Sequence, residues 1–426
     1  MRNPYLFLIV FTSLILAIDF YAYRGIKKLS VNYGKLIKRI VFILFWIIPL
    51  ILILGIILFG SINRSIDPAK FLTYFHFISG TFVLFYVPKL VFVIFNFFDD
   101  LVLLFKKLFT KKKVDLAEPD PNRTPITRGQ FLNRVGIVMA GLPFLSIAYG
   151  IKWGRFNYTI RNHTLRFANL PKSFDGLRVV QISDFHLGSF LNKKEEVEEA
   201  VEFINEQEPD LLLFTGDFVN NVSSEIDLFM PALKKLKAKY GMYSIFGNHD
   251  YGDYVKWETP EKRQENIDRI IKLQEEAGFE ILLNDSTKIE LNGESINLVG
   301  VENWGLPPFP QYGDLNKALA NVEKDSFKIL MSHDPTHWDE QILEQTNIDL
   351  TLSGHTHGAQ FGVEIPGWRW SPVSMRYKRW GGIYEEGKQY LNVNTGIGFI
   401  GFPGRVGMPP EISVIELRRS AGSGTV

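Results

Sequence analysis

The stretch Leu177–Gly188, LRVVQISDFHLG, decides the fold of the second half of the chain. Its first seven residues, Leu177–Ser183, form an apolar run typical of a buried β-strand, and Asp184 and His186 follow directly. Side chains two residues apart in an extended segment point the same way, so we expect this carboxylate and this imidazole to converge on one ion. The stretch therefore indicates a strand that ends in metal ligands.

Four further motifs repeat this arrangement, each at the end of an apolar β-like run. They are Gly216-Asp217 after Leu211–Thr215, Gly247-Asn248-His249-Asp250 after Met242–Phe246, His333 after Phe327–Ser332, and Gly354-His355-Thr356-His357 after Ile348–Ser353. Carboxylate, imidazole and amide groups are the ligands that hard and borderline divalent cations take in proteins. Five of the eight histidines lie in these four motifs and the first stretch together. The alternative is that each motif is an ordinary strand end with a turn-forming Asp, Asn or Gly, but this explains five such motifs in series poorly. The series predicts a two-metal hydrolase.

The ordered set, from about residue 175 to about residue 417, resembles the calcineurin-like metallophosphoesterases. Gly358-Ala359-Gln360 and Asn394–Gly398 with Arg405 are similar to the membrane-anchored, YkuE-like branch, although a glycine is commoner where Ala359 stands. The resemblance implies an α/β fold in which two facing β-sheets form a sandwich flanked by helices, with the metals at one edge. A multi-span, all-helical membrane region would precede it.

The resemblance also implies a role for each residue of the set. Asp184, His186 and His357 would hold the first metal, Asn248, His333 and His355 the second, and Asp217 would bridge them; His249 would face the leaving group, with Asp250 orienting its imidazole. Manganese is the leading metal, and this oxygen and nitrogen ligand set also accepts iron, zinc or magnesium. Arg405 is either a phosphate clamp or a structural arginine that bonds loop carbonyls.

The chemistry follows from the residue types as well. Two divalent ions about 3.5–4 Å apart activate a bridging water and neutralise charge on the attacking and leaving oxygens. His249 can supply the proton, and Asp250 would favour its protonated form. A Gly-x-Ser-x-Gly elbow, a His-Glu-x-x-His helix and a Gly-Lys-Ser/Thr loop are all missing from the sequence, which disfavours other hydrolase classes. The alternative is a non-catalytic, metal-dependent membrane sensor or scaffold, which would bind two ions and turn nothing over.

The first 150 residues differ sharply in composition from the rest. Four apolar spans, Pro4–Tyr23, Ile40–Gly60, Phe71–Phe98 and Val135–Ile151, have lengths suited to a bilayer, although the fourth is marginal and contains Pro143. We expect a membrane region with three transmembrane helices over 1–113, a linker over 114–130, a fourth membrane helix over 131–151, the catalytic domain over 152–417 and a disordered tail over 418–426. A re-entrant or interfacial fourth segment is the alternative.

Basic residues near the span ends predict the orientation. Six lie between the first two spans, over 24–39, and eight between the last two, over 106–134, so these connections are expected in the cytoplasm. With four crossings the catalytic domain is extracytoplasmic. Four basic residues after the fourth span, over 152–166, count against this orientation, and an interfacial fourth segment would make the domain cytoplasmic.

Partners follow from charge and composition. The net charge of +1 gives no indication of a nucleic acid partner, and the absence of cysteine excludes disulfides and thiolate metal sites. Trp368, Trp370, Tyr377 and Trp380 alternate with basic residues, as at a membrane interface, or else pack on a sheet edge. The resemblance implies a phosphodiester, phosphomonoester or pyrophosphate substrate, and a lipid or a lipid-linked nucleotide fits because a relative of this branch cleaves a UDP-linked diacylated glucosamine. The oligomeric state stays open.

Local patterns complete the expected domain. Helical stretches are predicted at 193–207, 226–239 and 261–278, and further β-like runs at 288–301, 327–332, 348–353 and 389–394. Their alternation indicates mixed sheets covered by helices.

Overall fold

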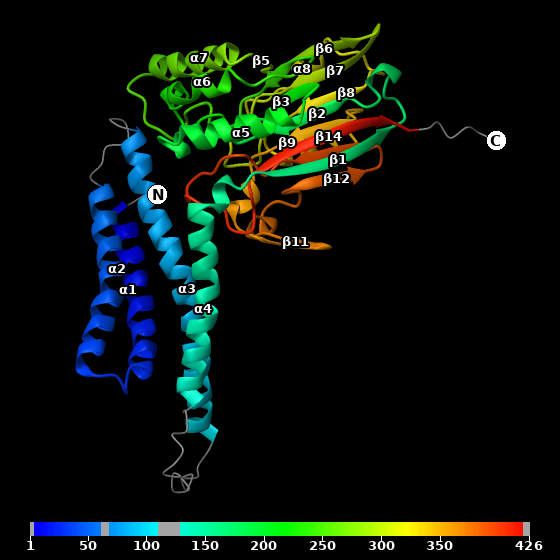
Figure 1. Ribbon diagram of the computed structural model, residues 1–426. Helices are drawn as coiled ribbons and strands as arrows, with labels where there is room; N and C mark the ends of the chain where they lie inside the picture. Colours follow the sequence, from blue (N-terminus) through cyan, green and yellow to red (C-terminus); the bar gives the residue numbers. More distant parts are fainter. Residues whose placement is uncertain (1–3, 61–67, 110–127, 421–426) are drawn as a thin grey trace, which may run out of the picture. The chain divides into compact units, whose positions relative to one another are not determined.

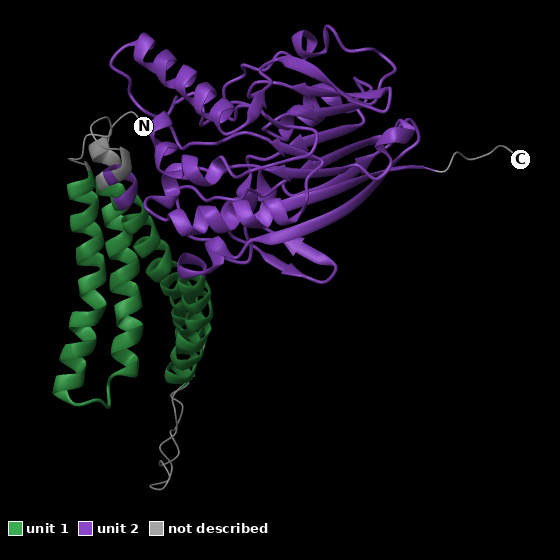
Figure 2. Cartoon of the chain, turned by 45° about the horizontal axis from the view of Figure 1, so that its top comes forward, with its two compact units in different colours: residues 1–62, 74–149 green, residues 63–73, 150–426 purple. Residues whose placement is uncertain are grey.

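The computed structural model describes residues 4–60, 68–109 and 128–420, which fall into two compact units (Figure 2). The first unit comprises residues 1–62 and 74–149, and the second comprises residues 63–73 and 150–426. The predicted linker lies largely outside the described residues, as does 421–426 of the predicted tail.

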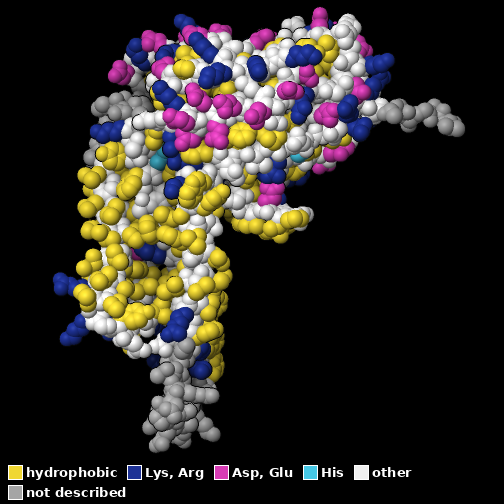
Figure 3. Space-filling view, in the orientation of Figure 1, with side chains coloured by type: hydrophobic (Ala, Val, Ile, Leu, Met, Phe, Trp, Pro, Cys, Tyr) yellow, Lys and Arg dark blue, Asp and Glu magenta, His cyan; other side chains and the backbone are white. Residues whose placement is uncertain are grey.

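The first unit consists of four long helices, α1 (Pro4–Leu29), α2 (Lys35–Gly60), α3 (Pro68–Phe109) and α4 (Arg128–Lys152). All four are long and apolar enough to cross a membrane. Hydrophobic side chains cover their visible outer surfaces (Figure 3), which is the pattern of helices that face lipid rather than water. The 25-residue α4 runs on through Pro143 and is about 37 Å long at 1.5 Å per residue, so it exceeds the marginal length that the sequence suggested. The chain is thus a membrane protein.

Contacts between the helices show that their directions alternate. Asp19 of α1 accepts hydrogen bonds from Tyr86 Oη at 2.5 Å and Lys89 Nζ at 2.6 Å, both on α3. Near the other end of the bundle, Asp99 of α3 pairs with Lys28 at 3.1 Å and with Arg128, the first residue of α4, at 2.9 Å. The helix ends that flank the two basic connections therefore lie at one end of this four-helix unit (Figure 1).

The second unit contains two six-stranded sheets. One has the order β1 (Thr159–Phe167), β14 (Glu411–Arg419), β2 (Arg178–Ile182), β3 (Leu211–Phe214), β4 (Met242–Ser244) and β5 (Phe279–Ile281). The other has the order β12 (Gly382–Glu386), β13 (Gln389–Val393), β9 (Leu350–Ser353), β8 (Lys328–Met331), β7 (Glu294–Gly300) and β6 (Asp285–Leu291). Strands β2 to β5 are parallel, as are β7, β8, β9 and β13. A small hairpin, β10 (Val363–Ile365) with β11 (Trp368–Trp370), stands outside both sheets.

The sheets face each other across an apolar core, with helices on both outer sides. Residues such as Leu213 of β3 and Leu352 of β9 share one buried cluster between the sheets. Helices α5 (Lys194–Glu206), α6 (Met230–Leu233) and α7 (Pro260–Glu276) contribute to a second cluster on the outer side of the first sheet. Helix α8 (Leu315–Leu319) and the turn Trp338–Ile342 contribute to a third on the other sheet. The predicted sandwich with flanking helices is confirmed.

Two local predictions were wrong. The run 288–301 is not one strand but the hairpin of β6 and β7, because Asn292 and Gly293, with φ of 51° and 80°, turn the chain. The helix predicted over 226–239 is broken into a short 3₁₀ turn (Asp227–Phe229) and the four-residue α6, since Pro231 can stand only in the first turn of a helix. At the C-terminal end, β14 continues through Arg419, two residues into the predicted tail.

Candidate metal centre

The motifs lie where parallel strands end, at one edge of the sandwich. Asp184 follows β2, Asp217 and Asn248 follow β3 and β4, and His333 and His355 follow β8 and β9 of the opposite sheet. A hydrogen bond from His333 Nδ1 to the carbonyl oxygen of Thr215, at 2.7 Å, joins the two sheets at this edge. The fold thus brings together all the ligand candidates from 184 to 357.

The first group of donors is Asp184, His186 and His357, all buried. The Nε2 atoms of the two histidines lie 3.1 Å apart, and Asp184 Oδ1 is 3.3 Å from that of His357 and 3.9 Å from that of His186. The convergence was predicted, but the extended backbone assumed for it was wrong: φ is 54° at Asp184 and 48° at His186, in the left-handed region. Such backbone strain is concentrated at functional sites.

The second group is Asp217, His333 and His355, with Asn248 beside it. Asp217 Oδ2 is 3.2 Å from His333 Nε2, and His355 Nδ1 is 3.3 Å from the same nitrogen and 2.9 Å from Asn248 Oδ1. The same Asp217 oxygen lies 3.5 Å from His186 Nε2 in the first group. One carboxylate therefore stands between the two sets of donors.

The donor spacing tests whether metal ions fit. Ligand atoms bound about 2.0–2.2 Å from one ion, at right angles to each other, lie about 3 Å apart. The 3.1 Å between the two Nε2 atoms and the 3.3 Å between His355 Nδ1 and His333 Nε2 match this value. Because the Thr215 carbonyl can only accept, His333 carries its proton on Nδ1 when neutral and presents the Nε2 lone pair to the site. The residues fit a pair of divalent cations.

Burial and charge set the ionisation of the cluster. Desolvation lowers the pKa of His186 well below its usual value and also lowers that of His355, so both rings are neutral lone-pair donors at pH 7. Desolvation would raise the pKa of Asp217, but the charges of His333 and His249 outweigh it and hold this pKa well below the usual range. For His333, the charge of Asp217 outweighs desolvation and raises the pKa to about 10. A bound cation would take the place of the proton that His333 carries.

Asp250 does not orient His249, contrary to the expectation from the sequence. Its buried carboxylate accepts four backbone N–H bonds, from Asp217 at 2.8 Å, Phe218 at 2.8 Å, Val219 at 3.2 Å and Gly247 at 2.9 Å. Desolvation and the charge of Asp217 raise the pKa of Asp250 to about 7, and the N–H groups of Gly247 and Val219 oppose this rise. Asp250 therefore shapes the loop that carries Asp217.

His249 takes its orientation from a backbone carbonyl. Its Nδ1 lies 2.8 Å from the carbonyl oxygen of Asn220, so Nδ1 carries a proton and Nε2 is left for the pocket. Its own N–H donates to Asp217 Oδ1 at 2.8 Å, and its ring lies against Tyr254 with centroids 4.5 Å apart. The imidazole is thereby held beside Asp217.

Of the two roles that the sequence left open for Arg405, a phosphate clamp and a structural arginine, its contacts are those of a structural arginine. The side chain is buried and donates to carbonyl oxygens of its own loop region: Gly398 at 2.8 Å, Thr395 at 2.8 Å and Gly396 at 2.9 Å. The alternative, a structural arginine, describes these contacts. The arginine at the pocket is Arg376, which is exposed and lies with its guanidinium 5.3 Å from the centre of the Phe309 ring.

Two tyrosines that the sequence did not connect with the metal centre hold the ligand candidates in place. Tyr254 Oη accepts a hydrogen bond from Asn248 Nδ2 at 2.7 Å, which turns Asn248 Oδ1 toward the second group of donors. Tyr377 Oη lies 2.9 Å from His355 Nε2, the nitrogen that points away from those donors. Neither tyrosine belongs to a strand-end motif, so spacing along the chain gave no signal for them.

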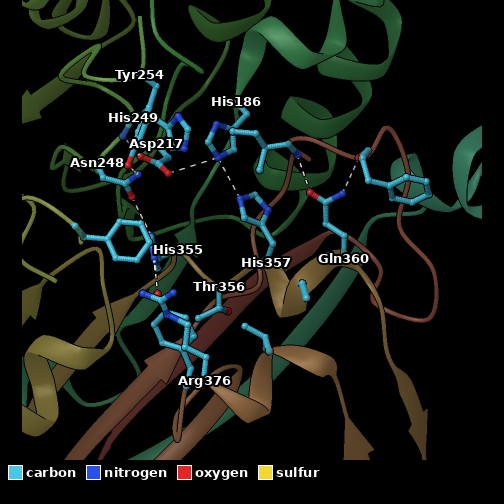
Figure 4. A pocket seen from close by; sticks show the side chains of 16 residues that line it. His186, Asp217, Asn248, His249, Tyr254, His355, Thr356, His357, Gln360 and Arg376 are labelled. Carbon is cyan, nitrogen blue, oxygen red and sulfur yellow. Dashed lines mark hydrogen bonds and ion pairs between the residues drawn. The ribbon is translucent and has the colours of Figure 1, made fainter. Parts of the chain in front are cut away.

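These groups line a cavity of about 450 Å³ (Figure 4). His186, Asp217, Asn248, His249, His355 and His357 form its floor, and an aromatic and apolar wall is made by Tyr254, Phe309, Val373, Tyr377, Ile400 and Phe402. Thr356, Ala359, Gln360 and Arg376 complete the lining. The pocket therefore combines a polar floor of possible metal ligands, one exposed arginine and an apolar wall.

The fold and the paired donor groups define a dimetal phosphoesterase, and comparisons with known proteins agree. Residues 177–359 match the calcineurin-like phosphoesterase family, and residues 1–155 match a family described as a probable calcineurin-like phosphoesterase, transmembrane domain. The chain is 30% identical over 305 residues to the "Uncharacterized metallophosphoesterase YkuE" of Bacillus subtilis, covering 69% of this chain and 98% of that protein. The chain belongs to the calcineurin-like metallophosphoesterases.

Two other relatives are similar over part of their length. A "Transmembrane protein with metallophosphoesterase domain" of Danio rerio is 29% identical over 261 residues, which are 59% of this chain and 55% of that protein. A metallophosphoesterase of Helicobacter pylori (strain J99) is 30% identical over 250 residues, which are 58% of this chain and 61% of that protein. In both, the chain spans less than two thirds of the relative.

Proposed function

We propose that this protein hydrolyses a phosphate ester or pyrophosphate carried by a lipid or a lipid-linked nucleotide, with two divalent ions held at the strand ends. Asp184, His186 and His357 would hold the first ion, Asn248, His333 and His355 the second, and Asp217 would bridge them. One observation carries the proposal: Asp217 Oδ2 lies 3.5 Å from His186 Nε2 and 3.2 Å from His333 Nε2, between the two groups. Manganese is our leading candidate for both ions.

Two bound ions would supply a hydroxide nucleophile at neutral pH and neutralise charge on the reacting phosphoryl oxygens. The chain's own residues would position the substrate and move one proton. The buried carboxylates and imidazoles sit on rigid strand ends, so little reorganisation accompanies the reaction. The single bridging carboxylate and the loop held by Asp250 fix the spacing of the two groups.

His249 would protonate the leaving oxygen from its Nε2. The carbonyl of Asn220 accepts the Nδ1 proton at 2.8 Å, and this contact orients the ring so that Nε2 faces the pocket. Arg376 replaces Arg405 as our candidate for the group that binds a non-bridging phosphate oxygen, because it is the arginine that lines the pocket. The apolar wall beside it would accept the less polar part of the substrate.

A chemical test uses a soluble aryl phosphodiester, bis(4-nitrophenyl) phosphate, with purified full-length protein and Mn²⁺. We expect turnover that is abolished by Asp217→Asn, because an amide cannot bridge two cations as a carboxylate does. Asp285→Asn makes the same chemical change at an exposed position on β6 and should leave turnover unchanged. Persistent activity in the Asp217 variant would refute the bridging role, and two bound ions without any turnover would favour the sensor or scaffold.

We further propose that the catalytic domain is extracytoplasmic. The 25-residue α4 and the basic connections at one end of the helical unit support four crossings. A reporter that works only outside the cytoplasm, fused after Val426, should be active, and protease added to spheroplasts should cut the domain. Activity of a cytoplasmic reporter at the same position would reverse the orientation.

A further inference from the structure

The hairpin of β10 and β11 exposes an apolar face. In its register Val363 stands opposite Trp370 and Ile365 opposite Trp368, so all four side chains share one side of the hairpin. Their exposed fractions are 46%, 41%, 54% and 51% in that order. Hydrophobic side chains appear in Figure 3 where Figure 1 labels β11. A contiguous patch of this kind marks an interaction surface.

The charged face of the same hairpin is turned toward the domain instead. Arg161 of β1 forms a bidentate ion pair with Glu364, at 2.7 and 2.6 Å. Arg369, the cross-strand partner of Glu364, lies with its guanidinium 4.8 Å from the centre of the Trp380 ring. A hairpin that faces water would turn its charged side chains to the solvent and its apolar side chains to the domain.

The base of the hairpin connects to the point where α4 ends. Gly362 N–H donates to the carbonyl of Val406 at 2.9 Å, and the neighbouring Arg405 N–H donates to the carbonyl of Gly150 at 3.2 Å. Gly150 and the rest of α4 up to Lys152 belong to the second unit. Trp153, directly after α4, is 54% exposed. The hairpin is therefore connected to the end of a candidate membrane span through two backbone hydrogen bonds, one on each side of the 405–406 peptide.

The loop that makes this connection also forms part of the pocket. Ile400 and Phe402 line the cavity, and Gln360 Nε2 donates to the carbonyls of Phe402 and Gly404, both at 2.8 Å. Shortly after β11, Met375 is 82% exposed, and Arg376 reaches the cavity. The hairpin, the end of α4 and the pocket wall share one continuous stretch of structure.

We propose that this apolar face is a membrane-docking surface that inserts into the headgroup region of a phospholipid bilayer. Tryptophan is enriched at that depth, and the exposed basic residues Arg376 and Lys378 nearby suit lipid phosphates. The bilayer is the occupant because the surface is continuous with the end of a membrane helix. Resting on the proposed function, docking would present the pocket to phosphate groups at the bilayer surface and select membrane-embedded substrates over soluble ones.

The absence of cysteine allows a direct test of docking. Ile365→Cys carries a nitroxide spin label on the apolar face, and Lys388→Cys, in the exposed turn between β12 and β13, carries the control label. In full-length protein reconstituted into phosphatidylethanolamine–phosphatidylglycerol vesicles, the label at 365 should collide with oxygen more than with a nickel chelate. The control should show the reverse. A water-like profile at 365 overturns docking, and shielding from both reagents overturns it in favour of a protein partner or second copy.

The selectivity needs an activity test with matched leaving groups. Phosphatidyl-4-nitrophenol in vesicles and soluble bis(4-nitrophenyl) phosphate are compared for the wild type and the double variant Ile365→Ser, Trp368→Ser. Replacing these two apolar side chains by serine should lower the rate of hydrolysis of the vesicle substrate about tenfold. The rate for the soluble substrate should stay unchanged. Equal rates for variant and wild type in vesicles overturn the selectivity. A wild type that turns over neither substrate refutes the proposed function, while the label experiment decides docking separately.

Discussion

Replacing Asp250 by asparagine distinguishes a structural role from a catalytic one. In the wild type each carboxylate oxygen accepts two backbone N–H bonds, from Phe218 and Val219 on one side and from Asp217 and Gly247 on the other. The amide keeps one acceptor oxygen and turns its NH₂ toward two donors. Two buried donors left unsatisfied cost about 1–3 kcal/mol each, so we expect a loss of about 2–6 kcal/mol in the free energy of unfolding.

The same change should loosen the metal centre, because the loop held by Asp250 carries Asp217. Removal of such a supporting group lowers metal affinity by about 10–100-fold. The assays are thermal unfolding and metal content after dialysis against buffered Mn²⁺, with Asp285→Asn as the control. If the variant keeps both ions and the wild-type Tm and loses turnover only, then Asp250 acts on the reaction through His249, and the structural role derived from its four backbone contacts is wrong.

Three further predictions follow from single contacts. His249→Ala should lower turnover about 10²–10⁴-fold with both ions retained, and the deficit should shrink for nitrophenol leaving groups, which need no proton; equal deficits would indicate charge stabilisation instead. His337 is buried, with its Nδ1 2.8 Å from Ser332 Oγ, and burial lowers its pKa to about 4. The stability that its neutral ring confers is therefore present above pH 6.5 and is lost as the pH falls toward 4, by about 2 kcal/mol between pH 7 and 5; His337→Gln should lose less on acidification in chemical denaturation. Asp19→Ala should destabilise the helical unit by about 3–5 kcal/mol because Lys89 is left buried and unpaired, and adding Lys89→Leu should restore the Tm in detergent.

The sequence predicted the fold and most of the site because strands and ligands are encoded in adjacent residues. Each apolar run becomes a strand or most of one, and the polar residue after it lies at the common edge. The hairpin of β6 and β7 was missed although Asn292-Gly293 is a strong turn signal. The break at Pro231 was equally visible in the sequence.

The roles of Asp250 and Arg405 could not be predicted from local sequence. Asp250 accepts hydrogen bonds from a segment about thirty residues earlier in the chain, and Arg405 donates to carbonyls of a loop that folds back on it. Only the assembled fold shows which N–H and carbonyl groups converge on these two side chains. Spacing along the chain also assumed an extended backbone at Asp184 and His186, whereas both have left-handed φ. The pattern therefore indicated which residues meet and not how they meet.

The aromatic cluster after the last ligand motif shows the same limit. Tyr377 and Trp380 are buried, as the alternative of packing on the sheet edge required, whereas Trp368 and Trp370 are exposed on the hairpin. Alternation with basic residues could not separate the two pairs, because burial depends on which face of the hairpin the body of the domain covers. That face is chosen by the ion pair between Arg161 and Glu364, residues about two hundred positions apart in sequence.

The loop 400–407 contacts the end of α4, the base of the β10–β11 hairpin and the pocket. Through Arg405 it holds the end of α4, through Val406 it holds the base of the hairpin, and through Ile400 and Phe402 it forms part of the pocket wall. The buried Arg405 side chain ties this loop to the segment 395–398 by donating to the carbonyls of Thr395, Gly396 and Gly398. Arg405, which the sequence left open as a phosphate ligand, thus holds in place a loop that forms part of the pocket wall.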